Sequence, residues 1–409
     1  EDPKFRRFRY GVQVNSLGLT EQQPENNVYR ILVEMLAVTL SKKARARAVQ
    51  LPAWNEALGL PRPWDQQWSM RMQQIMAFET DLLEYEDLFD GNQVVEAKVE
   101  SLKASARYEL ETIETQGGAL NAIEYMKSRL VESNTDRLQN IERNVTTVVG
   151  VNKFTKTETS PLVSGDGGIM IVDPAVEKDQ IDRLNLWRSN RNEKLVNKAL
   201  LSLRQAALNG KNIMPHSIEA AKAGATTGEW AQEMRDIYGE YRGPTGVATG
   251  ISNKTDGLDE LRSAVDAVSD KLGERLKFLM GKPGLDGHSN GAEQIASRAR
   301  DCGMKIEYQG IRLTPQELVE NVKSTKAHVV GLSILSGSHI PLVQDMINLL
   351  AEEGLTKIPI IVGGIIPEED KIKLLEMGIS KVYTPKDFEM NTIMMDIVNL
   401  AEPKELAAE

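Results

Sequence analysis

The chain has 409 residues, a net charge of −10 and 41% hydrophobic residues, so it is long enough for two or three globular domains. The acidic balance, with no basic stripe, argues against nucleic acid as a partner, and no apolar run reaches the length of a membrane span. The single cysteine, Cys302, excludes an intramolecular disulfide, and with no signal-peptide pattern at the start we expect a cytoplasmic protein.

Residues 1–150 are predicted to begin with strand and helix and to continue mostly as helix. Residues 11–14 are predicted as a buried strand, and the apolar residues between 28 and 36 recur at the spacing of one helix face. A second strand is expected at 47–54. Further helices are predicted at residues 70–83, 94–115 and 118–131.

The middle of the chain, residues 151–245, is predicted to be a linker region. Residues 152–173 are rich in Thr, Ser and Gly and indicate an extended connector, whereas residues 178–207 predict one long charged helix. Thr226 and Glu229 have the spacing of a capping box that opens another helix. Residues 242–246 then interrupt the helical pattern, and we place the last domain boundary there.

Residues 246–409 alternate between strand and helix patterns. Five strands are expected, each separated from the next by a helical pattern, near Phe278, Ile306, Val329, Ile360 and Val382. Thr314, Pro315 and Glu317 provide a helix start with both a capping box and a first-turn proline. This alternation predicts a doubly wound parallel sheet of flavodoxin-like order.

The loop after the first of these strands carries the pattern Asp286-x-His288-x-x-Gly291. Asp286 can bind one ring nitrogen of His288 and leave the other free for a metal, and the glycines of the loop allow a bulky ligand to approach the backbone. Taken alone, the pair also fits an ordinary strand-to-helix turn with a surface histidine.

Two further loops are expected at the same edge of the sheet. Ser333 and Leu335 close one buried strand, and Gly363 and Gly364 close another. His339, after the strand that contains Ser333, is expected at this edge as well. Ligands of open α/β sheets bind at the carboxyl ends of the strands, so the three loops together favour a binding site.

The three motifs at these intervals resemble the cobalamin-binding domain of the base-off, His-on class. The resemblance implies that His288 is the lower axial ligand of cobalt, with Asp286 and Lys282 as its relay, and that the nucleotide tail passes Ser333 and Leu335. The cofactor-binding residues implied in this way are Lys282, Asp286, Gly287, His288, Gly291, Ser333, Leu335, Gly337, Gly363, Gly364 and Thr384.

Residues 11–61 resemble the closing part of the (β/α)8 barrel of the adenosylcobalamin-dependent acyl-CoA mutases. The likeness lies in Gln13, in residues 19–22 and 26–28, and in residues 56–61. It implies that Gln13 and Glu56 face the adenosyl group and the substrate as catalytic residues. The implied architecture is the C-terminal part of the barrel at 1–150, a helical linker at 151–245 and a cobalamin-binding domain at 246–409.

The implied activity is a radical rearrangement of the carbon skeleton of a branched dicarboxylic acyl-CoA. Within the family the sequence is most similar to the ethylmalonyl-CoA branch, which converts ethylmalonyl-CoA to methylsuccinyl-CoA. A methylmalonyl-CoA mutase and a non-catalytic corrinoid carrier remain alternatives. The motifs for the thioester and the CoA chain are not found, so we expect an N-terminal barrel half in the same enzyme or in a partner chain, and a homodimer.

A phospho-acceptor receiver domain shares the flavodoxin-like order but does not fit. Its third strand would end in an aspartate that accepts the phosphoryl group, whereas the third strand here ends at Ser333.

Overall fold

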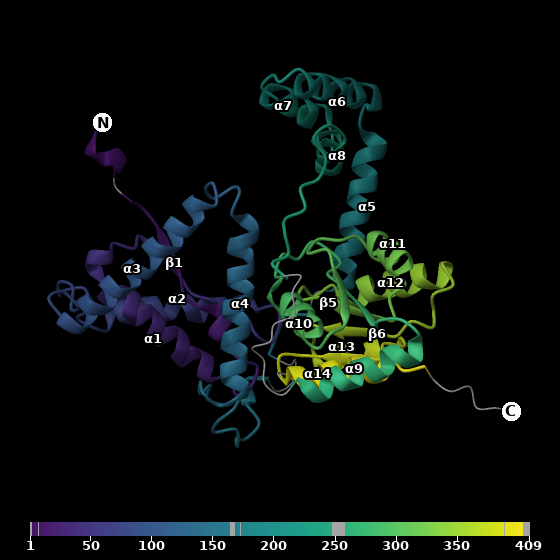
Figure 1. Cartoon of the computed structure of the whole chain (residues 1–409). Coiled ribbons are helices and arrows are strands. Elements are labelled where there is room, and N and C mark those ends of the chain that lie inside the picture. The colour runs from purple at the N-terminus through teal and green to yellow at the C-terminus, as the bar shows by residue number, and fades with distance from the viewer. Residues whose placement is uncertain are drawn as a thin grey trace. The chain divides into compact units, whose positions relative to one another are not determined.

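The computed structural model describes residues 2–6, 8–163, 168–171, 173–247, 258–387 and 389–403. The chain forms two compact units: residues 1–170 together with 244–409, and residues 171–243 (Figure 1). Among the described residues, no helix is both long and apolar enough to cross a membrane.

The N-terminal part of the first unit contains one βαβ element followed by helices. Strands β1 and β2 are parallel, with Gly11 opposite Ala48 and Gln13 opposite Gln50. The elements are β1 (Gly11–Gln13), α1 (Asn26–Leu40), β2 (Ala48–Gln50), α2 (Pro63–Phe78), α3 (Gln93–Thr115) and α4 (Ile123–Glu142). Their core is formed by Val14, Ile31, Met35, Leu51 and Trp54.

Three predictions for this part need correction. The strand at 11–14 is not buried, because in the described structure β1 pairs with β2 alone and Gly11 and Gln13 stay exposed; the core begins at Val14. Helix α2 begins at Pro63, seven residues before the predicted start, because proline suits the first helical turn. Helix α4 begins at Ile123, because Gly117 and Gly118 adopt positive φ and form a turn before it.

The C-terminal part of the first unit is a five-stranded parallel sheet with helices on both faces (Figure 1). The strand order β4-β3-β5-β6-β7 confirms the flavodoxin-like prediction, and all five predicted strands are present. The elements are α9 (Asp259–Leu272), β3 (Lys277–Gly281), α10 (Asn290–Asp301), β4 (Lys305–Tyr308), α11 (Pro315–Thr325), β5 (Val329–Ser333), α12 (His339–Glu352), β6 (Ile360–Gly363), α13 (Glu368–Glu376), β7 (Lys381–Tyr383) and α14 (Met390–Ala401).

Each face of this sheet has its own hydrophobic core. Helices α9, α10 and α14 pack on one face around Phe278 and Met394, and helices α11, α12 and α13 pack on the other around Leu279 and Val362. Strand β5 is buried along its whole length, as its continuous apolar sequence predicts for a central parallel strand. The sheet is therefore a rigid base for the loops at its carboxyl edge.

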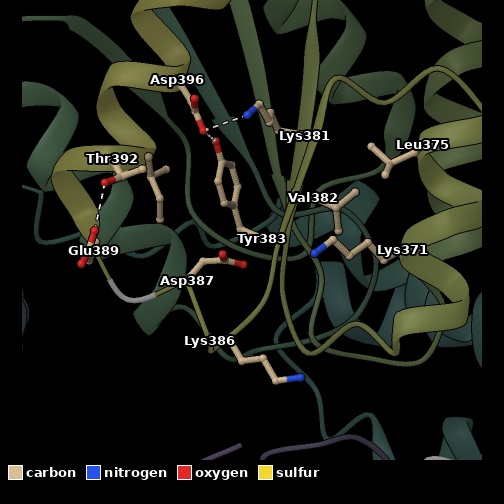
Figure 2. A pocket seen from close by; sticks show the side chains of 11 residues that line it. Lys371, Leu375, Lys381, Val382, Tyr383, Lys386, Asp387, Glu389, Thr392 and Asp396 are labelled. Atoms are coloured by element: carbon tan, nitrogen blue, oxygen red, sulfur yellow. Dashed lines mark hydrogen bonds and ion pairs between the residues drawn. The ribbon is translucent and has the colours of Figure 1, made fainter. Parts of the chain in front are cut away.

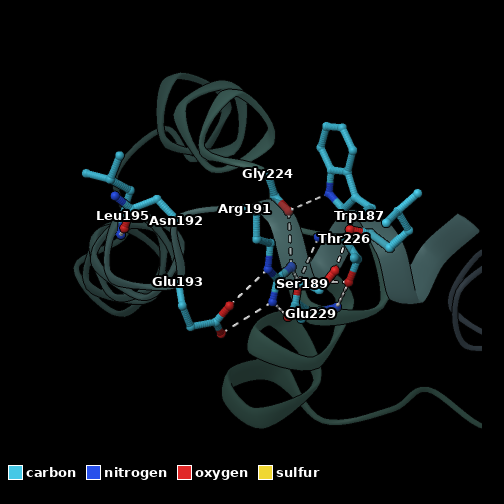
Figure 3. Close-up of polar contacts among 10 residues, drawn as sticks. Trp187, Ser189, Arg191, Asn192, Glu193, Leu195, Gly224, Thr226 and Glu229 are labelled. Atoms are coloured by element: carbon cyan, nitrogen blue, oxygen red, sulfur yellow. Dashed lines mark hydrogen bonds and ion pairs between the residues drawn. The ribbon is translucent and has the colours of Figure 1, made fainter.

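The second unit consists of four helices: α5 (Pro174–Asn190), α6 (Glu193–Leu208), α7 (Met214–Ala223) and α8 (Thr227–Tyr238). The prediction of one helix over 178–207 is wrong, because Arg191 is extended and the Asn192 side chain accepts a hydrogen bond from the backbone N–H of Leu195 (3.2 Å), which starts α6. The guanidinium of Arg191 binds the carboxylate of Glu229 at 2.7 Å (Figure 3). The predicted capping box of Thr226 and Glu229 is confirmed.

Replacing Glu229 with Gln is expected to lower the free energy of unfolding of this helical unit by about 1 kcal/mol at pH 7, because Arg191 loses its charged partner while Gln can still complete the capping box. The hydrogen bond from Arg191 lowers the pKa of Glu229 from 4.5 to about 2. A lowered folded-state pKa stabilises the fold above pH 4.5, and this contribution is lost as the pH falls toward 2. The difference between variant and wild type in urea unfolding should therefore shrink below pH 4. Glu219→Gln, at an exposed pair with Lys222, is the control and should show neither effect.

Candidate cofactor site

The loop between β3 and α10 is fixed to its neighbours by backbone hydrogen bonds. The N–H of Gly284 donates to the carbonyl of Leu313 (3.0 Å), and the N–H of Leu313 donates to the carbonyl of Lys282 (3.2 Å). Gly284 has a φ of +84°, and a Cβ there would lie 2.9 Å from a methyl group of Leu342. The position therefore requires glycine for both its backbone conformation and its packing.

Lys282, Asp286 and His288 form a connected chain of polar contacts in this loop. The ammonium of Lys282 lies 2.6 Å from Oδ2 of Asp286, and Oδ1 of Asp286 lies 2.6 Å from Nδ1 of His288. The backbone N–H of His288 also donates to Oδ1, at 3.0 Å. The Lys282 side chain is fully buried and that of Asp286 is 7% exposed, whereas that of His288 is 80% exposed.

These contacts determine which ring nitrogen of His288 is available to bind a metal. Burial alone would raise the pKa of Asp286, but the hydrogen bonds from Lys282 and from the backbone and ring of His288 lower it to about 2. An ionised carboxylate only accepts hydrogen bonds, so Nδ1 of His288 carries the proton. In the neutral form of the ring the lone pair is therefore on Nε2, and this exposed ring can bind a metal from the solvent side.

Replacing Lys282 with Met is expected to raise the pKa of Asp286 from about 2 by about 1 to 3 pH units, because a nearby positive charge is removed. Carboxyl carbon chemical shifts of labelled aspartate, followed between pH 2 and 7, measure this change. Lys305→Met, at an exposed position of β4, is the control. An unchanged Asp286 titration in Lys282→Met would contradict the proposed relay.

The other predicted cofactor residues lie at the carboxyl ends of adjacent strands. Ser333 ends β5 and is buried, Gly363 ends β6, and Thr384 directly follows β7 and is buried. Leu335, Gly337 and Gly364 lie in the loops after β5 and β6. The carbonyl of Ser333 accepts a hydrogen bond from Lys282 (3.4 Å), so the loops after β3 and β5 are directly connected.

The glycines of this edge provide the space that a large planar ligand needs. A Cβ on Gly291 would meet no atom within 4 Å, and one on Gly287 would meet only a guanidinium nitrogen of Arg312, at 3.5 Å. Gly364 is different, because a Cβ there would overlap the carbonyl oxygen of Ile334. The open glycines beside an exposed imidazole fit a corrin ring, whereas Gly364 is required by the packing of β5 against β6.

Of the two residues expected to be catalytic, the structure brings Glu56 close to the histidine loop. Burial raises the pKa of Glu56, and a hydrogen bond with Ser16 and the charge of His288 offset part of this increase. Gln13 is exposed at the end of β1, and among the described residues no hydrogen bond joins its side chain to the loop.

His339 does not lie free at this edge. It begins α12, its side chain is 2% exposed, and its Nε2 lies 2.8 Å from Oδ2 of Asp370 in α13. The pair therefore connects the two helices that follow β5 and β6. No spacing in the sequence indicated Asp370 as its partner.

A pocket of about 440 Å³ lies beside the outer strand β7 (Figure 2). The hydroxyl of Tyr383 donates to Oδ2 of Asp396 (2.8 Å), and burial, followed by this hydrogen bond, raises the pKa of Tyr383. The residues that line the pocket include Lys371, Lys381 and Asp387, and none of them belongs to the predicted cofactor set. This pocket is thus distinct from the histidine loop.

Comparison with known proteins agrees with this geometry. The family model described as B12 binding domain matches residues 276–385, and the one described as Methylmalonyl-CoA mutase matches residues 1–240. The parallel sheet with its oriented histidine is thus a B12-binding domain. The chain as a whole belongs to the methylmalonyl-CoA mutase family.

Three curated relatives show how the likeness is distributed. The ethylmalonyl-CoA mutase of Cereibacter sphaeroides is 67% identical over 409 residues, which are 100% of this chain and 63% of that protein. The ethylmalonyl-CoA mutase of Methylorubrum extorquens is 59% identical over 98% of this chain and 58% of that protein. The methylmalonyl-CoA mutase of Escherichia coli is 30% identical over 98% of this chain and 56% of that protein. The chain thus spans about 60% of the length of the curated relatives it matches.

Proposed function

We propose that this chain is part of an adenosylcobalamin-dependent isomerase that rearranges ethylmalonyl-CoA to methylsuccinyl-CoA. The observation that carries the proposal is the hydrogen-bonded chain from buried Lys282 through Asp286 to the exposed ring of His288, on a B12-binding domain. The ethylmalonyl-CoA substrate is favoured because the relatives with that name are 67% and 59% identical to the chain, against 30% for the methylmalonyl-CoA mutase of Escherichia coli.

The residues of the chain then have distinct tasks. His288 holds cobalt through Nε2, Asp286 keeps the proton on Nδ1, and Lys282 keeps Asp286 ionised. The remaining residues proposed to contact the cofactor are Gly287, Gly291, Ser333, Leu335, Gly337, Gly363, Gly364 and Thr384. When bound, adenosylcobalamin supplies the radical chemistry, and the protein supplies orientation and exclusion of water.

Residues 1–150 are proposed to be the C-terminal part of the substrate barrel, with Gln13 and Glu56 facing the reacting groups. Residues 151–245 connect it to the cobalamin-binding domain at 246–409. The described part of 1–150 contributes two parallel strands, so an eight-stranded barrel needs strands from outside residues 1–409, in the same enzyme or in a partner chain. We propose a homodimer of the complete enzyme.

The test is an isomerisation assay on the enzyme that contains this chain, loaded with adenosylcobalamin. Ethylmalonyl-CoA and methylmalonyl-CoA are supplied separately, and the products are identified by mass spectrometry. The proposal expects methylsuccinyl-CoA from the first substrate at a higher kcat/KM than any product from the second. A preference for methylmalonyl-CoA would contradict the substrate assignment, and binding of cobalamin without turnover of either ester would favour a corrinoid carrier.

A further inference from the structure

We propose that Lys127, on α4, is a positioning residue for His288 and acts through Ser289 and Glu293. This inference rests on the proposed role of His288 as cobalt ligand. It concerns a residue far from the cofactor motifs in sequence, in a part of the chain that belongs to the predicted barrel.

Lys127 makes two polar contacts with the start of α10. Its ammonium lies 2.6 Å from Oε1 of Glu293 and 3.3 Å from Oγ of Ser289. The Glu293 side chain is 4% exposed and that of Lys127 is 28% exposed. A carboxylate removed from water in this way is stabilised by a charged partner, and losing that partner is costly. The ion pair therefore holds the first turn of α10 against α4.

The contact with Ser289 connects the ion pair to the histidine loop. A serine at a helix N-cap usually accepts a hydrogen bond from a backbone N–H of the first turn. Ser289 makes no such side-chain bond, and its hydroxyl is instead available to the ammonium of Lys127. Because Ser289 directly follows His288, Lys127 fixes the direction in which the loop enters the helix.

The connector between the helical unit and the sheet also packs on Lys127. Gly246 has a φ of +72°, and a Cβ there would lie 2.7 Å from both Cγ and the carbonyl oxygen of Lys127. The aliphatic stem of Lys127 therefore lies against Gly246 while its ammonium contacts α10. Helix α4, the start of α10 and the segment at Gly246 therefore meet at the side chain of Lys127.

Other polar contacts between α4 and α10 include neither Lys127 nor Ser289. The hydroxyl of Thr135 donates to the side-chain oxygen of Gln294 (2.9 Å), and Arg298 pairs with Glu142 (2.9 Å). Neither contact includes a residue of the loop at 282–289. Thr135→Val therefore removes one hydrogen bond of the same interface and serves as a matched control for Lys127→Met.

The experiment compares wild type, Lys127→Met, Lys127→Arg and Thr135→Val in the intact enzyme. Lys127→Met keeps the stem and removes the charge, and it is expected to weaken cobalamin binding by about 10- to 100-fold. It should also lower the fraction of cob(II)alamin with a histidine nitrogen signal in electron paramagnetic resonance. In the cofactor-free protein, amide hydrogen exchange at 285–290 should become faster. Lys127→Arg should restore all three quantities, and Thr135→Val should leave them unchanged.

The outcomes separate this inference from the proposed function. If wild type shows no histidine nitrogen, the assignment of His288 fails. If wild type shows that nitrogen and Lys127→Met matches it in affinity, signal and exchange, the role of Lys127 is refuted. If the circular dichroism spectrum shows that Lys127→Met does not fold, Glu293→Gln replaces it in the experiment. This substitution keeps the shape of the side chain and removes its charge. Equal affinity and exchange in Glu293→Gln and wild type would then refute the proposal.

Discussion

Replacing His288 with Ala is expected to weaken cobalamin binding by about 100-fold or more, since changes in residues that only orient a metal ligand already cost 10- to 100-fold. The side chain of His288 is 80% exposed, and its ring forms a hydrogen bond with Asp286 in the same loop, so the substitution should leave the sheet intact. Isothermal titration of the cofactor-free protein with adenosylcobalamin measures the loss.

His216→Ala is the matched control for this experiment. His216 lies in the separate helical unit, where its Nδ1 is 3.0 Å from Oγ of Ser202. The control should bind cobalamin as wild type does. If His288→Ala kept the wild-type affinity for cobalamin, the corrin ring would have to bind elsewhere on the protein.

Replacing Gly364 with Ala is expected to lower the free energy of unfolding by about 3 kcal/mol, because the added methyl group must enter packed backbone. The carbonyl of Ile334 occupies the position that the new Cβ would take. Neighbouring hydrogen bonds hold the strands in place: Ile334 N–H donates to Gly363 (2.9 Å), and Gly364 N–H donates to Tyr383 (3.1 Å). Urea unfolding monitored by near-ultraviolet circular dichroism measures the change.

Gly291→Ala is the control for this second prediction. Gly291 lies in the first turn of α10, and a Cβ there would meet no atom within 4 Å. Alanine has a higher helix propensity than glycine, so the cofactor-free variant should equal wild type in stability or exceed it by up to about 1 kcal/mol. Equal losses in Gly364→Ala and Gly291→Ala would show that the strand ends are not packed as described.

The sheet was predictable because its inner strands β3, β5 and β6 are short, mainly apolar runs between helical patterns. Buried parallel strands need apolar side chains on both faces, and Val329, Val330 and Leu332 provide them in β5. The position of the three loops was predictable as well, since the carboxyl ends of parallel strands meet at one edge of the sheet. The pairing of Asp286 with His288 was predictable because it is local in sequence.

The contacts that orient the site from outside the sheet were not predictable in this way. Lys127 and Ser289 are 162 positions apart, and no periodicity of either segment indicates that they meet. The break at Arg191 was missed because the charged pattern continues through it and hides the cap that Asn192 provides for α6. The exposure of β1 was missed because its sequence does not show how many strands its sheet contains. In the described residues the sheet has two strands.

The most direct test of the central claim is electron paramagnetic resonance of the cob(II)alamin form of the enzyme, prepared with nitrogen-15 histidine. If Nε2 of His288 binds cobalt as proposed, the superhyperfine pattern changes from the three lines of nitrogen-14 to the two lines of nitrogen-15. A pattern that stays at three lines with labelled histidine would mean that the cofactor keeps its own benzimidazole, and would contradict the account.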